Sequence, residues 1–329
     1  MRRATKIWLI VAAALVVVGG IAFVGVMSAL KWDFTKLSTV KYEINNYEIH
    51  EAYQNITIVT DTADIQFVPT EGTVTSVECH EQKNLKHSVT VKDGTLVIEL
   101  VDTRKWYEHI GIGFGNSKMT VTIPQGEYGA LSIKSSTGDM EIPTNFQFES
   151  MDITASTGDV TNYASATESM KIKTSTGDIR VENLSAGSLD LSVSTGKVSI
   201  TDVTCEGDVS IRVSTGDSKL TDVACKNVTS SGDTGKLTMT NVIATERFSI
   251  ERDTGDVKLD GCDAAEIYVK TSTGDVTGTL LSEKIFVTQT STGNVKVPAC
   301  VTGGKCSITT STGDIRITIV EGTSKNSSH

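Results

Sequence analysis

The sequence predicts an all-β protein, a stacked single-rung β-solenoid of about 19–20-residue repeats, preceded by one N-terminal transmembrane α-helix. Three observations lead to this fold class. An uncharged apolar run lies near the N-terminus, and the dipeptide Thr-Gly then recurs ten times, with steps of 19 or 20 residues between its glycines. Aromatic residues make up only 5% of the chain, as expected for a thin core filled by the strand-forming residues Val, Ile and Leu.

The apolar run, residues 7–30, has 24 residues without a charge, more than the roughly 20 that a helix needs to cross a bilayer. The alternative is a cleaved signal peptide, whose apolar region is shorter, about 7–15 residues, and ends at an Ala-x-Ala-like site. The best match to such a site, residues 27–29, is weak. We therefore expect residues 7–30 to form an uncleaved anchor after a short cytoplasmic tip, residues 1–6.

The orientation of the anchor is predicted from the long domain on its C-terminal side. Three basic residues lie close to each end of the run, so their count does not decide, but long domains are translocated largely regardless of charge. We expect a single-pass protein of the cell membrane with a cytoplasmic N-terminus and an extracytoplasmic main domain. That domain keeps 27 basic and 40 acidic residues, a net charge of −13, which disfavours nucleic acid as a partner.

Residues 31–130 have strand signals with a looser pattern, and we expect them to form an N-terminal β region and cap of the solenoid. Residues 56–65 look like a degenerate rung in which Ala63 stands where other rungs have glycine. The pair Asp93-Gly94 between two apolar stretches predicts a β-hairpin. Residues 118–124 predict a further strand.

A stretch rich in aromatic residues and glycine, residues 104–115, interrupts this region. It is a candidate interaction loop through four side chains: Trp106, Tyr107, His109 and Phe114. The alternative, which we favour, is a cap over the open end of the solenoid, because terminal repeats must be capped. Its glycines have the wrong spacing and context for a dinucleotide-binding loop.

Residues 131–320 form the predicted repeat array. Apolar residues alternate with polar ones on both sides of each Thr-Gly pair, so each unit is a strand, a tight turn, a second strand and a corner. Glycine suits a turn position with positive φ. The structural turn glycines are Gly138, Gly158, Gly177, Gly196, Gly216, Gly235, Gly255, Gly274, Gly293 and Gly313.

Two further local features arise from the repeat. Six residues after the glycine come residue types that tolerate left-handed geometry, which predicts the second corner: Asn183, Asp202, Asp222, Asn241 and Gly261. In the unit before Gly293, Ile285 and Val287 stand one place early, and we expect a β-bulge there.

An aspartate follows most of the turn glycines and forms a column of Asp139, Asp159, Asp178, Asp217, Asp256, Asp275 and Asp314. Such a column could hold Ca²⁺. However, Lys197, Lys236 and Asn294 interrupt it, and the glycine-rich signature of Ca²⁺-binding β-rolls is absent. We therefore expect a solvated turn face.

We expect no enzymatic activity, no catalytic residues, no cofactor and no metal site. The repeated hydroxyl groups lack the single special setting, with a base alongside, that a nucleophile needs. The histidines have no spacing typical of metal ligands; they are His50, His80, His87, His109 and His329.

The six cysteines allow disulfides in an exported chain. Cys205 and Cys225 each lie nine residues after a turn glycine, so they should stack on adjacent rungs and could form one bridge. Other rungs have alanine at the same position, which indicates small buried residues instead. We expect free thiols overall and leave this one bridge open.

The anchor, the sequence Thr62-Ala63-Asp64-Ile65 and the tandem Ser-Thr-Gly-Asp rungs together resemble the bacterial "putative adhesin" domain family, also called toast-rack, over about residues 40–320. The resemblance implies a β-solenoid in the cell envelope and transfers no catalytic residues.

Two functions are hypotheses at this point. The first is a membrane-anchored, adhesin-like, non-enzymatic interaction module that binds an envelope or surface component, protein or glycan. The alternative is an accessory sensor or regulatory subunit of a cell-envelope stress response, with a membrane-protein partner bound through the anchor. Residues 321–329 are expected to be a disordered tail.

Overall fold

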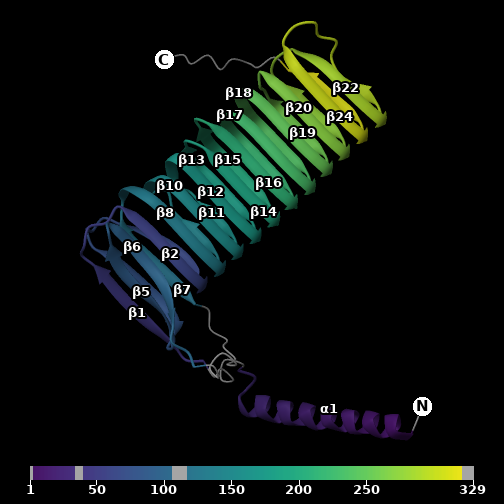
Figure 1. Cartoon of the computed structure of the whole chain (residues 1–329). Helices are drawn as coiled ribbons and strands as arrows, with labels where there is room; N and C mark the ends of the chain where they lie inside the picture. The colour runs from purple at the N-terminus through teal and green to yellow at the C-terminus, as the bar shows by residue number, and fades with distance from the viewer. Residues whose placement is uncertain (1–2, 34–39, 106–116, 321–329) are drawn as a thin grey trace.

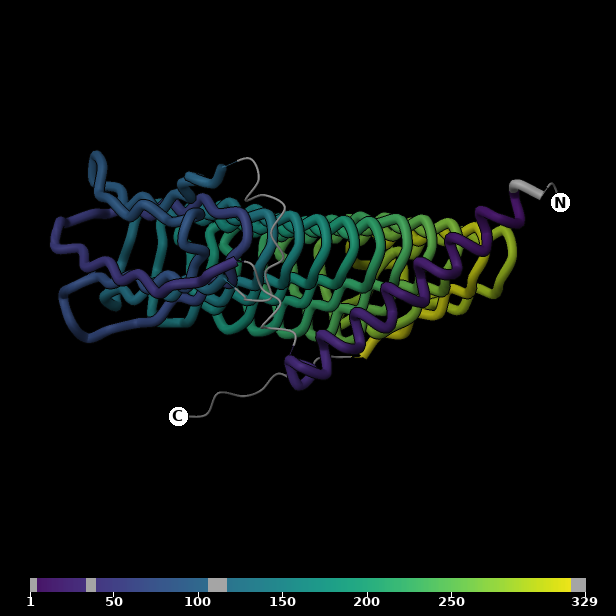
Figure 2. Tube along the Cα trace, turned by 90° about the horizontal axis from the view of Figure 1, so that it is seen from below, coloured from purple at the N-terminus to yellow at the C-terminus, as the bar shows by residue number. Residues whose placement is uncertain are grey.

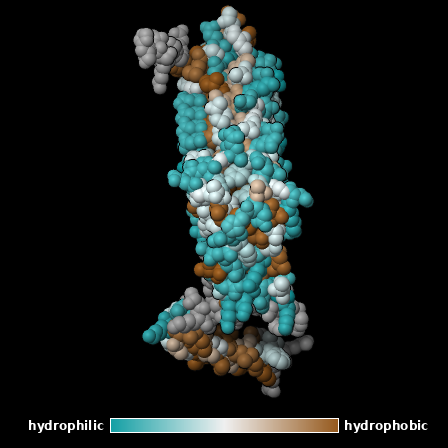
Figure 3. All heavy atoms as spheres, turned by 90° about the vertical axis from the view of Figure 1, so that its left-hand side faces the viewer, coloured by the Kyte–Doolittle hydropathy of each residue, from teal (hydrophilic) through white to brown (hydrophobic). Residues whose placement is uncertain are grey.

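The computed structural model describes residues 3–33, 40–105 and 117–320. It confirms an all-β chain behind one N-terminal helix, α1 (Arg3–Ala29). The segment Thr5–Ala29 is long and apolar enough to cross a membrane. Its side chains are exposed from Thr5 to Val26, and they form the brown helix below the largely hydrophilic rod in Figure 3.

The strands after residue 126 form the regular part of the β-solenoid, and their rungs appear as successive coils along one axis in Figure 2. One strand of each rung ends at the threonine of a Thr-Gly pair, and another begins two residues past the glycine. The long strands β17 (Ser218–Thr234) and β18 (Leu237–Thr254) do both. The other strands that end at threonine are β8 (Gly126–Thr137), β10 (Phe146–Thr157), β12 (Ser165–Thr176), β14 (Leu189–Thr195), β16 (Asp208–Thr215), β20 (Glu266–Thr273), β22 (Lys284–Thr292) and β24 (Gly304–Thr312). The others that begin past glycine are β9 (Met140–Ile142), β11 (Val160–Asn162), β13 (Ile179–Ala186), β15 (Val198–Cys205), β19 (Val257–Cys262), β21 (Val276–Leu280), β23 (Val295–Lys296) and β25 (Ile315–Ile319).

Parallel pairing between rungs places equivalent side chains above one another. In one typical rung Leu189, Leu191, Val198 and Ile200 are all fully buried, because alternate residues of each strand point into the coil. A single unit could not bury these side chains alone, so the core exists only through stacking. The left-handed corners predicted six residues past the glycine are confirmed, with φ between 52° and 62°.

The N-terminal strands close one end of the solenoid (Figure 1). β2 (Asn55–Thr62) and β3 (Asp64–Thr70) form the predicted rung at residues 56–65 and stack on β8 and β9. β6 (Thr95–Asp102) and β7 (Lys118–Pro124) stack on their other side. The hairpin at Asp93-Gly94 and the strand at 118–124 are both present as predicted.

Three antiparallel strands complete this end: β1 (Tyr42–Ile49), β4 (Thr75–Gln82) and β5 (Leu85–Lys92). β4 pairs with both β1 and β7, while β5 pairs with β6. We call these three strands the cap. They replace the parallel stacking of the rod by antiparallel pairing, so another rung cannot be added in the same way.

The opposite end of the solenoid is interlaced. β24 lies between β20 and β22, and β25 lies between β21 and β23, so the last rung of the sequence is inserted beneath the preceding one. The β-bulge expected at Ile285 and Val287 is wrong, because β22 pairs with β24 without a register shift. Both side chains instead point outward and are 44% and 52% exposed.

Candidate functional site

The turn glycines define one edge of the rod, and two constraints act on them. All ten have φ between 134° and 153°, a region that side chains rarely adopt. In addition, a Cβ atom on Gly138 would lie 2.1 Å from the carbonyl oxygen of Ala63 in the next rung. Glycine is therefore required by the close approach of neighbouring rungs as well as by the turn.

The aspartate column is part of the same stacking. The backbone N–H of Asp159 donates to Oδ1 of Asp139 at 2.8 Å, and that of Asp178 donates to Oδ1 of Asp159 at 2.8 Å. Lys197 occupies an aspartate position and still donates its backbone N–H to Asp178. Each carboxylate thus satisfies a turn N–H of its neighbour, which gives the column a structural role.

A continuous row of exposed threonines runs beside the glycines. These eleven residues are aligned in the register of the parallel strands, and we call the row the threonine ladder: Thr62, Thr137, Thr157, Thr176, Thr195, Thr215, Thr234, Thr254, Thr273, Thr312 and Thr292 in spatial order. From Thr157 onward, the nine backbone carbonyls of the row each accept the N–H group of a neighbouring turn glycine, and the carbonyl of Thr137 accepts that of Ala63. Their hydroxyl groups have no hydrogen-bond partner among the described residues, so stacking does not explain why the row is always threonine.

An open hollow of about 580 Å³ on another side of the rod is lined by charged residues. Its side chains already pair with one another: Arg247 with Glu266 at 2.7 Å, and Asn227 with Asp208 at 2.8 Å. Since these groups satisfy one another, the hollow offers little unpaired polarity to a ligand.

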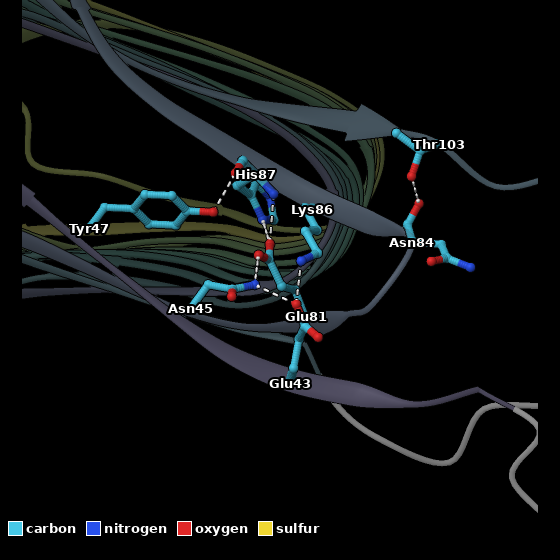
Figure 4. A network of polar contacts seen from close by, with 8 residues as sticks. All are labelled: Glu43, Asn45, Tyr47, Glu81, Asn84, Lys86, His87 and Thr103. Carbon is cyan, nitrogen blue, oxygen red and sulfur yellow. Dashed lines mark hydrogen bonds and ion pairs between the residues drawn. The ribbon is translucent and has the colours of Figure 1, made fainter.

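A different kind of site lies between the cap and the first rung. Figure 4 shows its side chains from the cap, namely Asn45 and Tyr47 of β1, Glu81 of β4 and His87 of β5, and Thr60 of β2 joins them from the first rung. Glu81 Oε2 accepts hydrogen bonds from the backbone N–H of His87 at 2.7 Å and contacts His87 Nδ1 at 2.6 Å. Glu81 Oε1 accepts a hydrogen bond from Asn45 at 2.7 Å, and His87 Nε2 lies 2.9 Å from Thr60 Oγ1. The hydroxyl of Tyr47 donates to the His87 carbonyl at 2.8 Å.

This network is buried, with Glu81 1% and His87 5% exposed. The order hydroxyl, imidazole, carboxylate resembles that of a hydrolytic triad, but Thr60 is only 7% exposed, so a substrate cannot reach its hydroxyl. Cys79 lies in the same cluster, and burial together with the nearby Glu81 carboxylate raises its pKa to about 12. The network fastens β1, β4 and β5 onto the first rung.

Sequence reasoning missed this cluster. Cys79 and Glu81 alternate on one strand and so share a face, which is a visible signal. The position of His87 beside them depends on the hairpin between β4 and β5, and that of Thr60 on the stacking of the cap on β2. The separation of these residues along the sequence therefore does not indicate that their side chains meet.

Two further sequence predictions concern the candidate interaction loop and the possible bridge between Cys205 and Cys225. The candidate loop residues Trp106, Tyr107, His109 and Phe114 lie outside the described residues. Cys205 and Cys225 are both free thiols in the structure. Cys205 Sγ lies 3.7 Å from the carbonyl oxygen of Gly187, as suits a small buried residue.

Comparison with known proteins assigns the chain to a family. The Toastrack DUF4097 family matches residues 53–217 and 206–327. A "putative adhesin" from Parabacteroides merdae is 16% identical with a TM-score of 0.50, covering 73% of this chain and 97% of that one. A "putative adhesin" from Parabacteroides distasonis is 15% identical with a TM-score of 0.44, covering 83% of this chain and 98% of that one.

A "putative lipid binding protein", also from Parabacteroides distasonis, is 17% identical with a TM-score of 0.48 and covers 73% of this chain and 98% of that one. No curated protein matches the chain. At 16% identity and a TM-score of 0.50, the Parabacteroides merdae structure indicates a shared fold and no shared ligand.

Proposed function

Because the chain belongs to the Toastrack DUF4097 family, we propose that it is a membrane-anchored, non-enzymatic interaction module. In this proposal α1 crosses the cell membrane with its N-terminus in the cytoplasm, and the solenoid stands outside as an adhesin-like rod. The rod binds an envelope or surface glycan along its threonine ladder.

The threonine ladder is the observation that carries the proposal. It extends over eleven stacked rungs, from Thr62 to Thr292, and its hydroxyl groups are exposed and without partners among the described residues. Neighbouring rungs are about 4.8 Å apart, so the ladder offers evenly spaced hydrogen-bonding groups to a linear polymer. A polymer with many hydroxyl groups suits such a row, because each weak contact adds to the next.

The test compares two triple variants of the full chain reconstituted in liposomes. Thr195, Thr215 and Thr234 are changed to valine, which keeps the branched shape and removes three ladder hydroxyls. The matched control changes Thr201, Thr221 and Thr240 to valine; these are also aligned in register but lie past the turn, on the second strands.

Sedimentation with insoluble glycans, namely peptidoglycan sacculi, chitin and cellulose, measures retention. We expect the ladder variant to lose about tenfold in affinity for at least one glycan, equal to about 1.4 kcal/mol, while the control binds as the unchanged chain does. Equal loss in both variants, or no retention of the unchanged chain on any glycan, would overturn the assignment of the ladder as a glycan site.

The anchored topology has its own experiment. Protease added to intact cells that express the full chain should degrade the solenoid, and the membrane fraction should keep a fragment containing α1. A protected solenoid would contradict the proposed orientation, and a solenoid released without α1 would indicate that the apolar segment is cleaved as a signal peptide.

A further inference from the structure

We propose that Cys79, Glu81 and His87 form a binding site for a divalent transition-metal ion, with Zn²⁺ the best chemical fit. One ligand atom of each residue lies within 4.8 Å of the other two, and this is the only such group among the residues that the structure describes. The backbone places the three side chains close together, because Cys79 and Glu81 lie on one face of β4 and His87 follows on β5.

The ligand set selects the class of metal. A thiolate sulfur, an imidazole nitrogen and a carboxylate oxygen together suit Zn²⁺, whereas Ca²⁺ and Mg²⁺ prefer oxygen alone. Charge points the same way, because one thiolate and one carboxylate balance a divalent cation. Cys79 and Glu81 are each 1% exposed, and a neutral complex avoids leaving a net charge in this buried place.

Binding requires one proton to leave and one to change place. The Cys79 thiol releases its proton to solvent as the sulfur–metal bond forms, so the reaction yields one proton per ion. His87 Nδ1 exchanges its 2.6 Å contact with Glu81 for the metal. The ring proton then resides on Nε2, which donates to Thr60 Oγ1 across the existing 2.9 Å contact.

Thr60 and Asn45 position the ligands. Thr60 would hold His87 in the tautomer that leaves Nδ1 free, and Asn45 holds the second carboxylate oxygen of Glu81 at 2.7 Å. Such supporting contacts typically change metal affinity by about 10–100-fold. Ions could enter beneath β1, which pairs only with β4 among the described strands.

The experiment uses the full chain in detergent, stripped with a chelator, with Co²⁺ as the probe. We expect one Co²⁺ per chain, a thiolate-to-cobalt charge-transfer band in the near ultraviolet, and loss of that band when Zn²⁺ is added. Cys79→Ser should abolish the band. Thr60→Val should keep the band and weaken binding by about 10–100-fold.

Two controls separate this site from other thiols. Cys306→Ser replaces a thiol that is also buried and lies outside the Cys79, Glu81 and His87 group, and Cys300→Ser removes the partly exposed thiol; both variants should keep the band. If Cys79→Ser fails to fold by circular dichroism, X-ray absorption at the zinc edge of the unchanged chain decides, with one sulfur neighbour expected. No charge-transfer band in the unchanged chain, a band that survives Cys79→Ser, or a zinc spectrum without sulfur would overturn the proposal.

Discussion

Arg252 Nη2 donates a hydrogen bond to Ser230 Oγ at 2.8 Å inside the solenoid core, and a second to Ser218 Oγ at 3.1 Å. Arg252 is 2% exposed, and its Nε and Nη1 atoms have no hydrogen-bond partner among the residues that the structure describes. The neighbouring rungs have Ile211 and Ile250 at the level of Ser230. Small polar residues have thus replaced large apolar ones where the guanidinium enters.

This arrangement predicts that Arg252→Met stabilises the solenoid. Burial lowers the pKa of the Arg252 guanidinium, which shows that its charged form is disfavoured there. Methionine fills a similar volume without an uncompensated charge, so the free energy of local unfolding should rise by about 1–2 kcal/mol. Hydrogen exchange of the amides of β17 and β18 measures it.

The control for this variant is Arg247→Met, at an exposed arginine paired with Glu266. Exposed ion pairs contribute little, so its effect should stay below about 1 kcal/mol. A loss of stability with Arg252→Met larger than that of the control would show that the buried guanidinium is satisfied by a bound water or anion.

The turn glycines give a second prediction, that Gly216→Ala is far more destabilising than Gly94→Ala. Gly216 has φ of 136°, and its new Cβ would lie 1.8 Å from the carbonyl oxygen of Gly196. Gly94, in the hairpin turn, has φ of 71° and open space around it. We expect about 1 kcal/mol for Gly94→Ala from backbone strain alone and at least about 3 kcal/mol for Gly216→Ala, where a displaced rung is added. Thermal unfolding of the two variants should differ accordingly, and equal midpoints would show that the close approach of rungs carries no cost.

The regular rungs could be predicted because stacking repeats one environment. Every unit meets the same neighbours, so the same residue types recur at the same places, as at Leu189 and Val209, which are paired in register. The left-handed corner at Asn183 was visible for the same reason.

The two ends could not be predicted in this way. A Thr-Gly motif fits a rung wherever that rung lies in the stack, so the period says nothing about β24 being inserted before β22. The cap cluster depends on contacts among residues far apart in the chain, as between Thr60 and His87. The only sequence signal for the pocket that holds Arg252 is that Ser218 and Ser230 stand at positions that are apolar in neighbouring rungs.

The carboxyl group of Asp314 predicts that the stability of the end rung, formed by β22 and β23, depends on pH. The backbone N–H of Asn294, which donates to Asp314 Oδ1 at 2.7 Å, and then the charge of Arg316 hold the pKa of this carboxyl below its usual value. A folded-state pKa below the unfolded value means that the stabilisation is complete above the unfolded value, about pH 4, and is lost as the pH falls through the folded value. The amides of β22 and β23 should therefore exchange faster relative to the rest of the rod only below about pH 4. Asp314→Asn keeps an acceptor oxygen and should remove this pH dependence; if the dependence persists in that variant, another group is responsible.

The buried thiols predict selective alkylation. Burial raises the pKa of Cys225 and Cys306 to about 12 and that of Cys262 to about 11, so their reactive thiolate forms are scarce at pH 8. Cys300 is partly exposed. Iodoacetamide at pH 8 should label the native chain at Cys300 alone, and all six cysteines after unfolding without reductant, as counted by mass spectrometry. Four labels in the unfolded chain would establish a disulfide and contradict the free thiols of Cys205 and Cys225.

The orientation of β22 predicts how the far end tolerates charge. Val287 points outward and is 52% exposed, whereas Ile308, on the adjacent β24, points inward and is fully buried. Val287→Lys should therefore change the free energy of unfolding by less than about 0.5 kcal/mol, as at other surface positions. Ile308→Lys should cost about 3 kcal/mol or more, because the ammonium would be buried without a partner. Urea unfolding followed by hydrogen exchange of β22 and β24 compares them. A large loss in the free energy of unfolding from Val287→Lys would show that Val287 lies in the core. It would then support the β-bulge, since only a one-residue shift turns that side chain inward.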